Sequence, residues 1–439
     1  MKPCNVLHIT AHLGGGVGKA LSGLIMHNPP DSHIRHAVIC LERPEKSQFV
    51  DRVRTNGGEV AICPSHEQLA AAIVQADIVQ LEWWNHPATI EALCRAALPA
   101  MRLLVWCHIS GLHNPIIPRP LIEASHKCLF TSPCSYDAAE ISLMPPAVRE
   151  RLDVVHSAGG FEELPFPEGP SDRPLLAGYL GSLNFAKLHP QYVDFMAAVP
   201  DPGFRVRMIG DMVNRDILEC QCEQLGRKGL LEFRGYTTDI ASELAAIDVF
   251  PYLLNPRHYG TSENALLEAM AMGVVPIVLD NPAERCLVKD RETGLVVRTP
   301  AEFADAMLWL AKNPGERKRI ATAAMTSVRS RFAADKMVDA LREHYVQLLS
   351  KDRRTISFAE IFGRTPADWF LSCQASSAPF LDGYSEVAID PFSIHELLER
   401  TKGTVFHFQT YFPDDNNIKR MADHLMACVH LSKMTKGSL

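Results

Sequence analysis

Short apolar runs alternate with helix-like periodic segments over the first third of the chain. Between the runs, apolar residues recur at three- and four-residue spacing, as in 17–26 and 67–75. Alternation of this kind predicts an α/β fold with a parallel sheet covered on both faces. The expected strands of this part are Asn5–Thr10, His36–Cys40, Ile78–Glu82, Arg102–His108, Lys127–Thr131 and Asp153–His156.

The alternation pauses at residues 161–174, a stretch with four prolines and little hydrophobic order. We interpret it as a linker between two similar α/β halves. A ligand of such an architecture is expected in the cleft, at the carboxyl ends of strands, with closure by hinging near the linker. The expected strands of the second half are Leu176–Leu183, Arg205–Ile209, Leu231–Arg234, Asp248–Tyr252 and Val274–Leu279.

The last part of the chain has a different pattern. Residues 333–350 predict an amphipathic helix, and a further helical pattern lies at 418–431. The segment 353–439 is apolar enough to fold, and shaping an acceptor site, forming oligomers and binding a partner all stay open as its role. The expected boundaries are 1–165 for the first domain, 166–335 for the second, 336–352 for a return helix and 353–439 for a C-terminal extension.

Composition narrows the classes of protein. A net charge of −7 argues against a general nucleic-acid surface. No apolar run approaches the roughly 20 residues that span a bilayer, so no transmembrane segment is expected. The twelve cysteines lie mostly in apolar segments, which is typical of buried thiols in a reducing compartment. A cytoplasmic location is therefore expected, with peripheral attachment to the inner membrane face left open.

The glycine-rich stretch HLGGGVGKAL begins at His12. It fails the P-loop pattern, because Leu13 stands at the first glycine and Ala20 at the hydroxyl that would bind Mg²⁺. It also fails the dinucleotide-binding pattern, whose third glycine falls at Lys19. What it predicts is a strand, a glycine turn and a helix, whose free N–H groups suit an anion or a close ligand. A tight turn with no ligand is the alternative.

The segment 255–278, NPRHYGTSENALLEAMAMGVVPIV, carries the most chemistry. Thr261 or Ser262 is expected to cap a helix that runs to about Met272 and ends at Gly273. Backbone N–H groups at that helix start would suit a diphosphate. Glu268 lies among apolar residues, where a carboxylate needs hydrogen bonds. It could grip two ribose hydroxyls or form a salt bridge.

This segment resembles the signature of family 4 glycosyltransferases, which are retaining enzymes of the GT-B fold. LLEAMAMGVVPIV is similar to the family's most recognisable run, and HLGGGVGKAL, VWCHISG, DVVHSAGGF and GSLNFAKLHP resemble further stretches in the same order. The resemblance covers roughly residues 5–350. It implies two Rossmann-like domains facing a cleft, the first on the acceptor side and the second binding a nucleotide sugar.

The resemblance also implies roles for single residues. Glu268 would hold the donor ribose, Lys187 would contact the diphosphate, and Gly15 and Gly16 would let the first domain approach the donor. His108 would bond the transferred sugar or lie beside the reacting carbon. The alternative is an ordinary histidine at a strand end. The donor-binding loop and helix start comprise Arg257, Gly260, Thr261, Ser262, Glu263 and Asn264.

Two positions depart from the family pattern. Gly260 stands where the family has a glutamate, and Glu263 could replace that carboxylate. Ser182 stands where the family has an arginine before the clamp lysine, so a second cation would have to come from Arg257 or Arg234. At the acceptor side, Glu82, Trp83 and Trp84 end a strand. The tryptophans could meet a sugar ring or simply pack.

We therefore expect a retaining glycosyltransferase that moves a hexose-like sugar from a nucleotide diphosphate sugar to an acceptor. The acceptor could be a glycan, a lipid-linked sugar, a small molecule or a protein. His108, Lys187 and Glu263 are the expected catalytic residues, with no cofactor and no metal, since no Asp-x-Asp stands at a strand end. The alternatives are a non-catalytic sugar- or nucleotide-binding subunit and, more remotely, a P-loop ATPase.

Overall fold

The computed structural model describes residues 3–158, 161, 163–166, 175–381 and 391–435. It divides into two compact units, one formed by 1–159 with 334–439 and the other by 160–333. The expected linker at 161–174 lies mostly outside the described residues, which there are 161 and 163–166. In the described chain, no helix combines the length and apolar character needed to cross a membrane.

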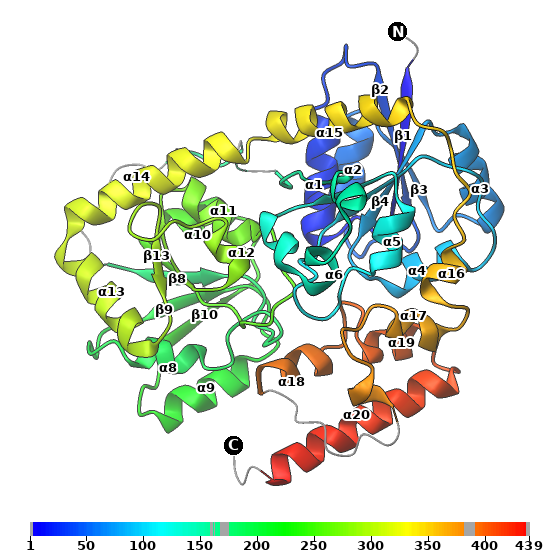
Figure 1. Ribbon diagram of the computed structural model, residues 1–439. Coiled ribbons are helices and arrows are strands. Elements are labelled where there is room, and N and C mark those ends of the chain that lie inside the picture. Colours follow the sequence, from blue (N-terminus) through cyan, green and yellow to red (C-terminus); the bar gives the residue numbers. More distant parts are fainter. Residues whose placement is uncertain (1–2, 159–160, 162, 167–174, 382–390, 436–439) are drawn as a thin grey trace. The chain divides into compact units, whose positions relative to one another are not determined.

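The first unit is built on a seven-stranded parallel sheet in the order β3-β2-β1-β4-β5-β6-β7 (Figure 1). All residues of β4 and β5 are buried, which explains their continuous apolar sequence. The strands are β1 Cys4–Thr10, β2 Ile34–Cys40, β3 Glu59–Ile62, β4 Ile78–Trp83, β5 Leu103–Cys107, β6 Lys127–Phe130 and β7 Leu152–Val154.

Helices cover this sheet, and the return helix α15 (Ala334–Leu349) belongs to the same unit. Its Leu341 and Tyr345 share a core cluster with Leu21 and Leu24 of α1. The other helices before residue 159 are α1 Gly15–Met26, α2 Gln48–Thr55, α3 His66–Gln75, α4 Pro87–Cys94, α5 Arg119–Ala124, α6 Ala139–Ser142 and α7 Pro146–Arg149, with a 3₁₀ helix at Pro133–Asp137.

The C-terminal extension also packs on the first unit. Its helices α16, α17 and α19 contact α4, and Met101 pairs with Arg354 in an isolated bridge. The elements of this segment are α16 Phe358–Phe362, α17 Pro366–Leu371, a 3₁₀ helix at Ala378–Phe380, α18 Pro391–Leu398, α19 Val405–Tyr411 and α20 Asn416–Thr435.

The second unit contains a six-stranded parallel sheet in the order β10-β9-β8-β11-β12-β13 (Figure 1). Its strands are β8 Ala177–Leu180, β9 Val206–Ile209, β10 Leu231–Gly235, β11 Val249–Tyr252, β12 Val275–Leu279 and β13 Leu295–Val297. Its helices are α8 Tyr192–Ala197, α9 Arg215–Gln224, α10 Ile240–Ala245, α11 Asn264–Ala271, α12 Pro282–Arg285, α13 Pro300–Lys312 and α14 Pro314–Arg331.

Both sheets reverse their strand order at one point, between β1 and β4 in the first unit and between β8 and β11 in the second. In open parallel sheets, ligands bind beyond the carboxyl ends of strands at such a switch point. The loops that follow β1, β4, β8 and β11 are therefore the places to look for function.

Candidate functional site

In the second unit, the loops after β8 and β11 are joined to each other. The backbone N–H of Asn255 donates to the carbonyl of Lys187 at 2.8 Å, and Leu188 bridges Leu254. The Asn255 side chain donates to the carbonyl of Phe185 at 2.8 Å. These bonds fix Lys187 relative to the loop that leads into α11.

Lys187 and Glu263 form a buried ion pair at this switch point. The Lys187 Nζ lies 2.6 Å from both Glu263 Oε1 and Glu263 Oε2. The Tyr252 hydroxyl donates to Oε2 at 2.6 Å. The side chains of Lys187 and Glu263 are 17% and 1% exposed. The ammonium that we expected beside a diphosphate is thus paired with the carboxylate that we expected beside the sugar.

Gly260 leaves the space that the Glu263 carboxylate fills. A Cβ built on Gly260 would come within 2.0 Å of Glu263 Oε1 and 2.4 Å of Lys187 Nζ. No ordinary side chain could enter without moving the ion pair. Glu263 therefore places a carboxylate where a side chain at position 260 would have to be.

A second buried pair, His258 and Glu284, supports the same loop. The Gly260 N–H donates to His258 Nδ1 at 3.1 Å, so the neutral ring carries its proton on Nε2. That nitrogen lies 3.1 Å from Glu284 Oε2, to which it donates. The Asn281 amide donates to the other oxygen of Glu284 at 3.3 Å. This arrangement holds the backbone of Gly260 in place.

Burial and charge compete at Glu263. Burial raises the pKa of its carboxyl, but the charge of Lys187, the electrostatic effect of the neighbouring His258, and the hydrogen bonds from Lys187 and Tyr252 together lower it below the usual value. Burial raises the pKa of Tyr252 well above its usual value, so the phenol stays a donor. Glu263 is therefore a carboxylate at neutral pH.

The expected helix cap is wrong. Helix α11 begins at Asn264, and its N-cap residue is Glu263, whose side chain makes no capping bond. Neither Thr261, which is buried, nor Ser262 caps the helix. Glu263 has a φ of 38°, in the left-handed region, because its carboxylate is directed to Lys187 and Tyr252 instead of to the helix. The helix ends at Ala271, and Gly273 follows with a φ of 71°.

The other predicted donor residues lie around the same loop. Glu268 is 8% exposed within α11, and Asn264 opens the same helix. The Arg257 backbone N–H donates to Asn255 Oδ1 at 2.9 Å, which places this residue in the loop itself. Arg234 lies in a different strand, β10, and faces Glu243 at 3.8 Å, with its side chain 53% exposed. Their roles toward a ligand stay predictions.

In the first unit, the glycine loop opens α1. Gly15 and Gly16 occupy the first turn and are exposed, and Gly14 caps the helix without a side-chain bond. A Cβ on Gly15 would meet nothing within 4 Å, although its φ of 53° favours glycine. Position 20 is a buried alanine. Because alanine has no hydroxyl, it offers no ligand for a magnesium ion. The exposed N–H groups of this turn suit a close ligand.

His108 follows β5 and is paired with Glu82 of β4. Its Nε2 lies 2.7 Å from Glu82 Oε2. The other oxygen of Glu82 accepts from Gln80 at 2.7 Å and lies 3.0 Å from His8 Nδ1. Burial raises the pKa of Glu82, but the hydrogen bonds from His108 and His8 outweigh it, so its pKa lies below the usual value. Glu82 is therefore an anion, and its carboxylate holds the His108 ring in place.

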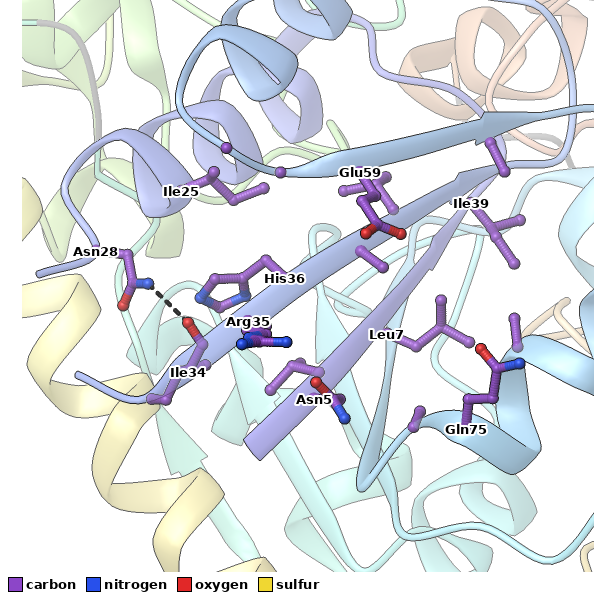
Figure 2. Close-up of a pocket in the computed structure, with 18 of the residues that line it drawn as sticks. Asn5, Leu7, Ile25, Asn28, Ile34, Arg35, His36, Ile39, Glu59 and Gln75 are labelled. Carbon is purple, nitrogen blue, oxygen red and sulfur yellow. Dashed lines mark hydrogen bonds between the residues drawn. The ribbon is translucent and has the colours of Figure 1, made fainter. Parts of the chain in front are cut away.

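The chain of buried groups continues to the amino end of β2. His8 Nε2 lies 2.9 Å from His36 Nδ1, and burial with the neighbouring His8 lowers the pKa of His36 well below its usual value. His36 lines a cavity of about 920 Å³ together with Asn5, Arg35 and Glu59 (Figure 2). The cavity mixes apolar and polar walls, and nothing about it indicates one class of ligand.

Glu82 and Trp83 do not lie at the acceptor surface as expected. Both are completely buried. The Trp83 ring stacks on Phe362 of α16 at a centroid distance of 5.4 Å, so its function is packing against the C-terminal extension. Trp84 is partly exposed, and Lys402 lies 5.6 Å from its ring centre. Alternation along a strand puts these two neighbours on opposite sides.

Several residues of these clusters were not predicted from the sequence. Tyr252, His258 and Glu284 surround the Lys187–Glu263 pair, and His8 and His36 extend the His108–Glu82 pair. A polar residue inside an apolar strand was the available signal for His8 and His36, since such a group needs a partner. Tyr252 looked like an ordinary strand aromatic.

Residues 160–326 match the model of the family described as glycosyl transferases group 1. The lipopolysaccharide core biosynthesis glycosyltransferase LpsE of Rhizobium meliloti (strain 1021) is 28% identical over 183 residues, which cover 41% of this chain and 51% of LpsE. The chain therefore matches about half the length of this curated relative.

Solved structures resemble a larger part of the chain. A glycosyltransferase from Rickettsia africae ESF-5 superposes with a TM-score of 0.62 at 14% identity, over 80% of this chain and 100% of the other. HepE of Anabaena, solved with UDP and glucose, has a TM-score of 0.60 at 16% identity, over 78% of this chain and 100% of its own. The chain therefore has the GT-B fold with a C-terminal extension, and its residues 160–326 are similar to the glycosyl transferases group 1 family.

Proposed function

We propose that the protein is a glycosyltransferase that moves a hexose-like sugar from a nucleotide diphosphate sugar to an acceptor hydroxyl, with retention at the anomeric carbon. The observation that carries this proposal is the buried Lys187–Glu263 pair beside Gly260, at the switch point of the unit that is similar to the group 1 family. HepE, which was solved with UDP and glucose, and LpsE, a lipopolysaccharide core biosynthesis glycosyltransferase, support a nucleotide-sugar donor and a glycan acceptor.

In this mechanism the bond between the anomeric carbon and the diphosphate oxygen breaks as the acceptor oxygen bonds to that carbon. The acceptor's proton leaves with the diphosphate, so atoms and charges balance. Lys187 stabilises the developing negative charge on the leaving group. Glu263 holds the Lys187 side chain in place, and it accepts hydrogen bonds from sugar hydroxyls.

The remaining residues position the donor. Glu268 binds the two ribose hydroxyls, and the N–H groups at 260–264 bind phosphate or sugar. Gly15 and Gly16 leave room for the donor at the first turn of α1, and His108 bonds the transferred sugar. Arg257 supplies the second positive charge. The chemistry expected of these groups needs no metal ion, so EDTA should leave the rate unchanged.

Incubation with UDP-, GDP- and ADP-sugars, followed by chromatography of the released nucleotide, tests the proposal. At least one donor should be hydrolysed or consumed, and the product should keep the anomeric configuration by NMR. Inversion would contradict retention and would point to His108, held by Glu82, as a base. Absence of both binding and turnover for every donor would contradict the proposed function.

A non-catalytic GT-B module is the second candidate, and one observation favours it. Lys187 is neutralised by Glu263 in an ion pair that is almost fully buried. A diphosphate would then meet less net positive charge than a free lysine provides. Nucleotide binding without turnover over a panel of acceptors would support this candidate.

We also propose a cytoplasmic location. All twelve cysteines are unpaired, and most are buried, which fits a reducing compartment. Peripheral attachment to the inner membrane face would bring the enzyme to a lipid-linked acceptor, and flotation with vesicles tests it.

A further inference from the structure

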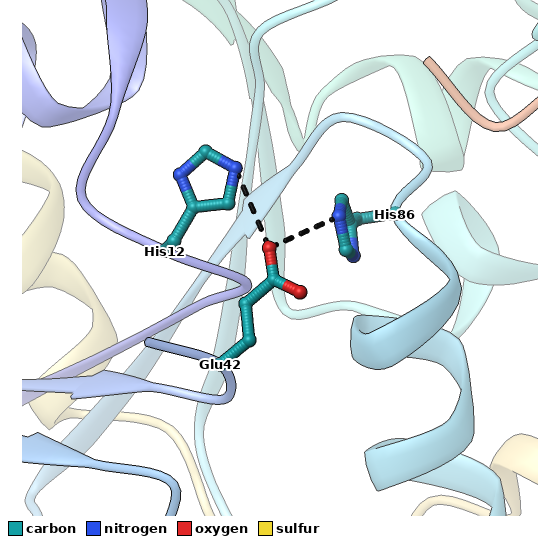
Figure 3. A group of neighbouring side chains, drawn as sticks. All are labelled: His12, Glu42 and His86. Carbon is teal, nitrogen blue, oxygen red and sulfur yellow. Dashed lines mark ion pairs between the residues drawn. The ribbon is translucent and has the colours of Figure 1, made fainter. Parts of the chain in front are cut away.

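The switch point of the first unit carries a polar cluster that the proposed mechanism does not use. His12, Glu42 and His86 follow β1, β2 and β4, which are neighbours in the sheet. The Glu42 Oε1 atom lies 3.6 Å from His12 Nε2 and 3.4 Å from His86 Nε2 (Figure 3). The side chains of His12 and Glu42 are each 29% exposed, so a ligand can reach them.

The C-terminal extension forms one wall of this cluster. The rings of His407 and Tyr411 in α19 meet the His86 ring edge to face, at centroid distances of 4.7 and 5.2 Å. His12 and His86 in turn contact the Trp84 ring at 5.0 and 4.7 Å. The cluster is thus closed by a segment that lies more than three hundred residues later in the chain.

The backbone at this contact is tightly constrained. The Asn85 amide donates to the carbonyl of Gly403 at 3.4 Å, and the Gly403 N–H donates to His407 Nδ1 at 3.0 Å. Asn85, Lys402 and Gly403 all have left-handed φ values, of 60°, 62° and 75°. A Cβ on Gly403 would come within 2.1 Å of the Asn85 side chain. Such strain persists only where the surroundings enforce it.

Burial shifts the pKa values of the groups in this cluster toward their neutral forms. Burial, with a contribution from the charge of Lys402, lowers the pKa of His86 to about 2 and that of His407 to about 4. The pKa of His12 is lowered for the same two reasons. Burial, helped by the charge of Glu45, raises the pKa of Glu42 to about 7. Near neutral pH, the cluster offers neutral imidazoles and a carboxyl that can donate or accept.

A metal ion fits the distances but not the surroundings. The N–H of Ala88 donates to His86 Nδ1 at 3.2 Å, so the His86 proton is on Nε2, the atom that faces Glu42. Ligation through Nε2 would move that proton to Nδ1, against the Ala88 hydrogen. The positive charge of Lys402 lowers the pKa of His12, His86 and His407, and it would also repel a cation.

An anion fits no better, because Glu42 and Glu45 carry or acquire negative charge on the same loop. A hydroxyl group differs from both ions, since it donates to a carboxylate and accepts from an imidazole or ammonium. We propose that His12, Glu42 and His86, closed by His407 and Tyr411, form a subsite for the hydroxyl groups of a sugar ring.

The position of this subsite links it to the acceptor. A Cβ on Gly14 would come within 2.7 Å of His12 Nδ1, so the His12 ring lies against the start of the glycine loop. A sugar bound at His12 and Glu42 lies beside the exposed first turn of α1. Resting on the proposed function, this identifies the sugar as part of the acceptor and makes the C-terminal extension a determinant of acceptor specificity.

Saturation-transfer NMR on the full chain tests the subsite, with methyl glycosides of glucose, galactose and N-acetylglucosamine as probes. At least one glycoside should bind, and Glu42→Gln should weaken its affinity at least about tenfold, as expected for a hydrogen bond to a charged group. Gly403→Ala should also weaken it, because the new methyl group displaces the C-terminal wall. Circular dichroism and thermal melting verify that each variant is folded.

Two matched variants serve as controls. Glu67→Gln changes an exposed carboxylate of the same unit, and Gly315→Ala adds a Cβ where nothing lies within 4 Å. Both should bind the glycoside like the unmodified protein. The inference is overturned if no glycoside binds, or if Glu42→Gln and Gly403→Ala bind normally. Binding of Zn²⁺ or Mn²⁺ that is lost in Glu42→Gln would also overturn it.

Titration of the same samples with UDP, GDP and ADP keeps the two proposals apart. Nucleotide binding without glycoside binding contradicts only the subsite. Glycoside binding that depends on Glu42, in a protein that neither binds nor turns over any nucleotide sugar, supports the subsite and contradicts the proposed transferase.

Discussion

The carboxylate of Glu263 occupies the place of a side chain at Gly260, since a Cβ there would lie 2.0 Å from Glu263 Oε1. The backbone of Gly260 lies outside the left-handed region, so only space excludes a larger residue. Glu263 in turn reaches this place with a left-handed φ of 38°. This geometry fits the proposal that Glu263 replaces the carboxylate that the resembled family carries at position 260.

This relationship predicts the outcome of moving the carboxylate. Gly260→Glu alone should destabilise the loop and weaken nucleotide binding, because two carboxylates would compete for one space. Gly260→Glu combined with Glu263→Gly should restore binding in part, since glycine accepts the left-handed backbone at 263. Calorimetric titration with UDP measures the nucleotide affinity of the single and the double variant. A double variant as weak as the single one would show that the two positions are not equivalent.

Lys187→Met should cost roughly 3–5 kcal/mol of unfolding free energy at pH 7, because it leaves a buried carboxylate without a partner. Urea unfolding measures the loss. Without Lys187 the pKa of Glu263 rises, so the penalty should shrink as the pH falls toward 5 and the carboxyl takes a proton. Adding Glu263→Gln should recover most of the loss at pH 7. An unchanged stability in Lys187→Met would mean that the pair is not formed in solution.

Glu268→Gln should weaken nucleotide affinity by about 1–3 kcal/mol, the scale for losing charged hydrogen bonds to ribose. Calorimetric titration is the measurement. Glu232→Gln, which changes an exposed carboxylate on β10, is the control. Equal affinity of the Glu268 variant and the control would assign Glu268 a structural role.

Glu42→Gln should stabilise the protein at pH 8 and have little effect at pH 5. The folded-state pKa of Glu42, about 7, lies above its value of 4.5 without the fold, so folding favours the protonated form. That contribution is complete below pH 4.5 and is lost as the pH rises through 7. We expect a gain of about 1–2 kcal/mol at pH 8 after allowing for partial exposure. Denaturant unfolding at both pH values decides the sign.

Most strands of the two sheets could be predicted from the sequence, because buried parallel strands are continuous apolar runs. All eleven expected strands match strands of the structure to within a few residues, as with Ile78–Glu82 and β4. The strands β3 and β13 were missed. β3 is short and lacks a fully buried residue, so its pattern was too weak to detect.

The candidate sites could be predicted from the sequence only in part. Lys187 and Glu263 were each singled out, but their pairing joins residues 76 positions apart, which no local pattern records. The same distance in sequence explains the wrong helix cap, because Thr261 and Ser262 satisfy every local rule while a remote lysine and tyrosine orient Glu263. Likewise, the adjacent tryptophans suggested sugar binding, but Phe362 covers one of them.

The two units differ in how the chain completes them. The second is one uninterrupted stretch, 160–333, and can fold on the ribosome as soon as it emerges. The first needs both 1–159 and the residues from 334 onward, so Trp83 and Asn85 gain their partners only after the second unit has been synthesised. During translation the amino-terminal sheet therefore passes through a stage with exposed apolar surface, where chaperone protection would matter most.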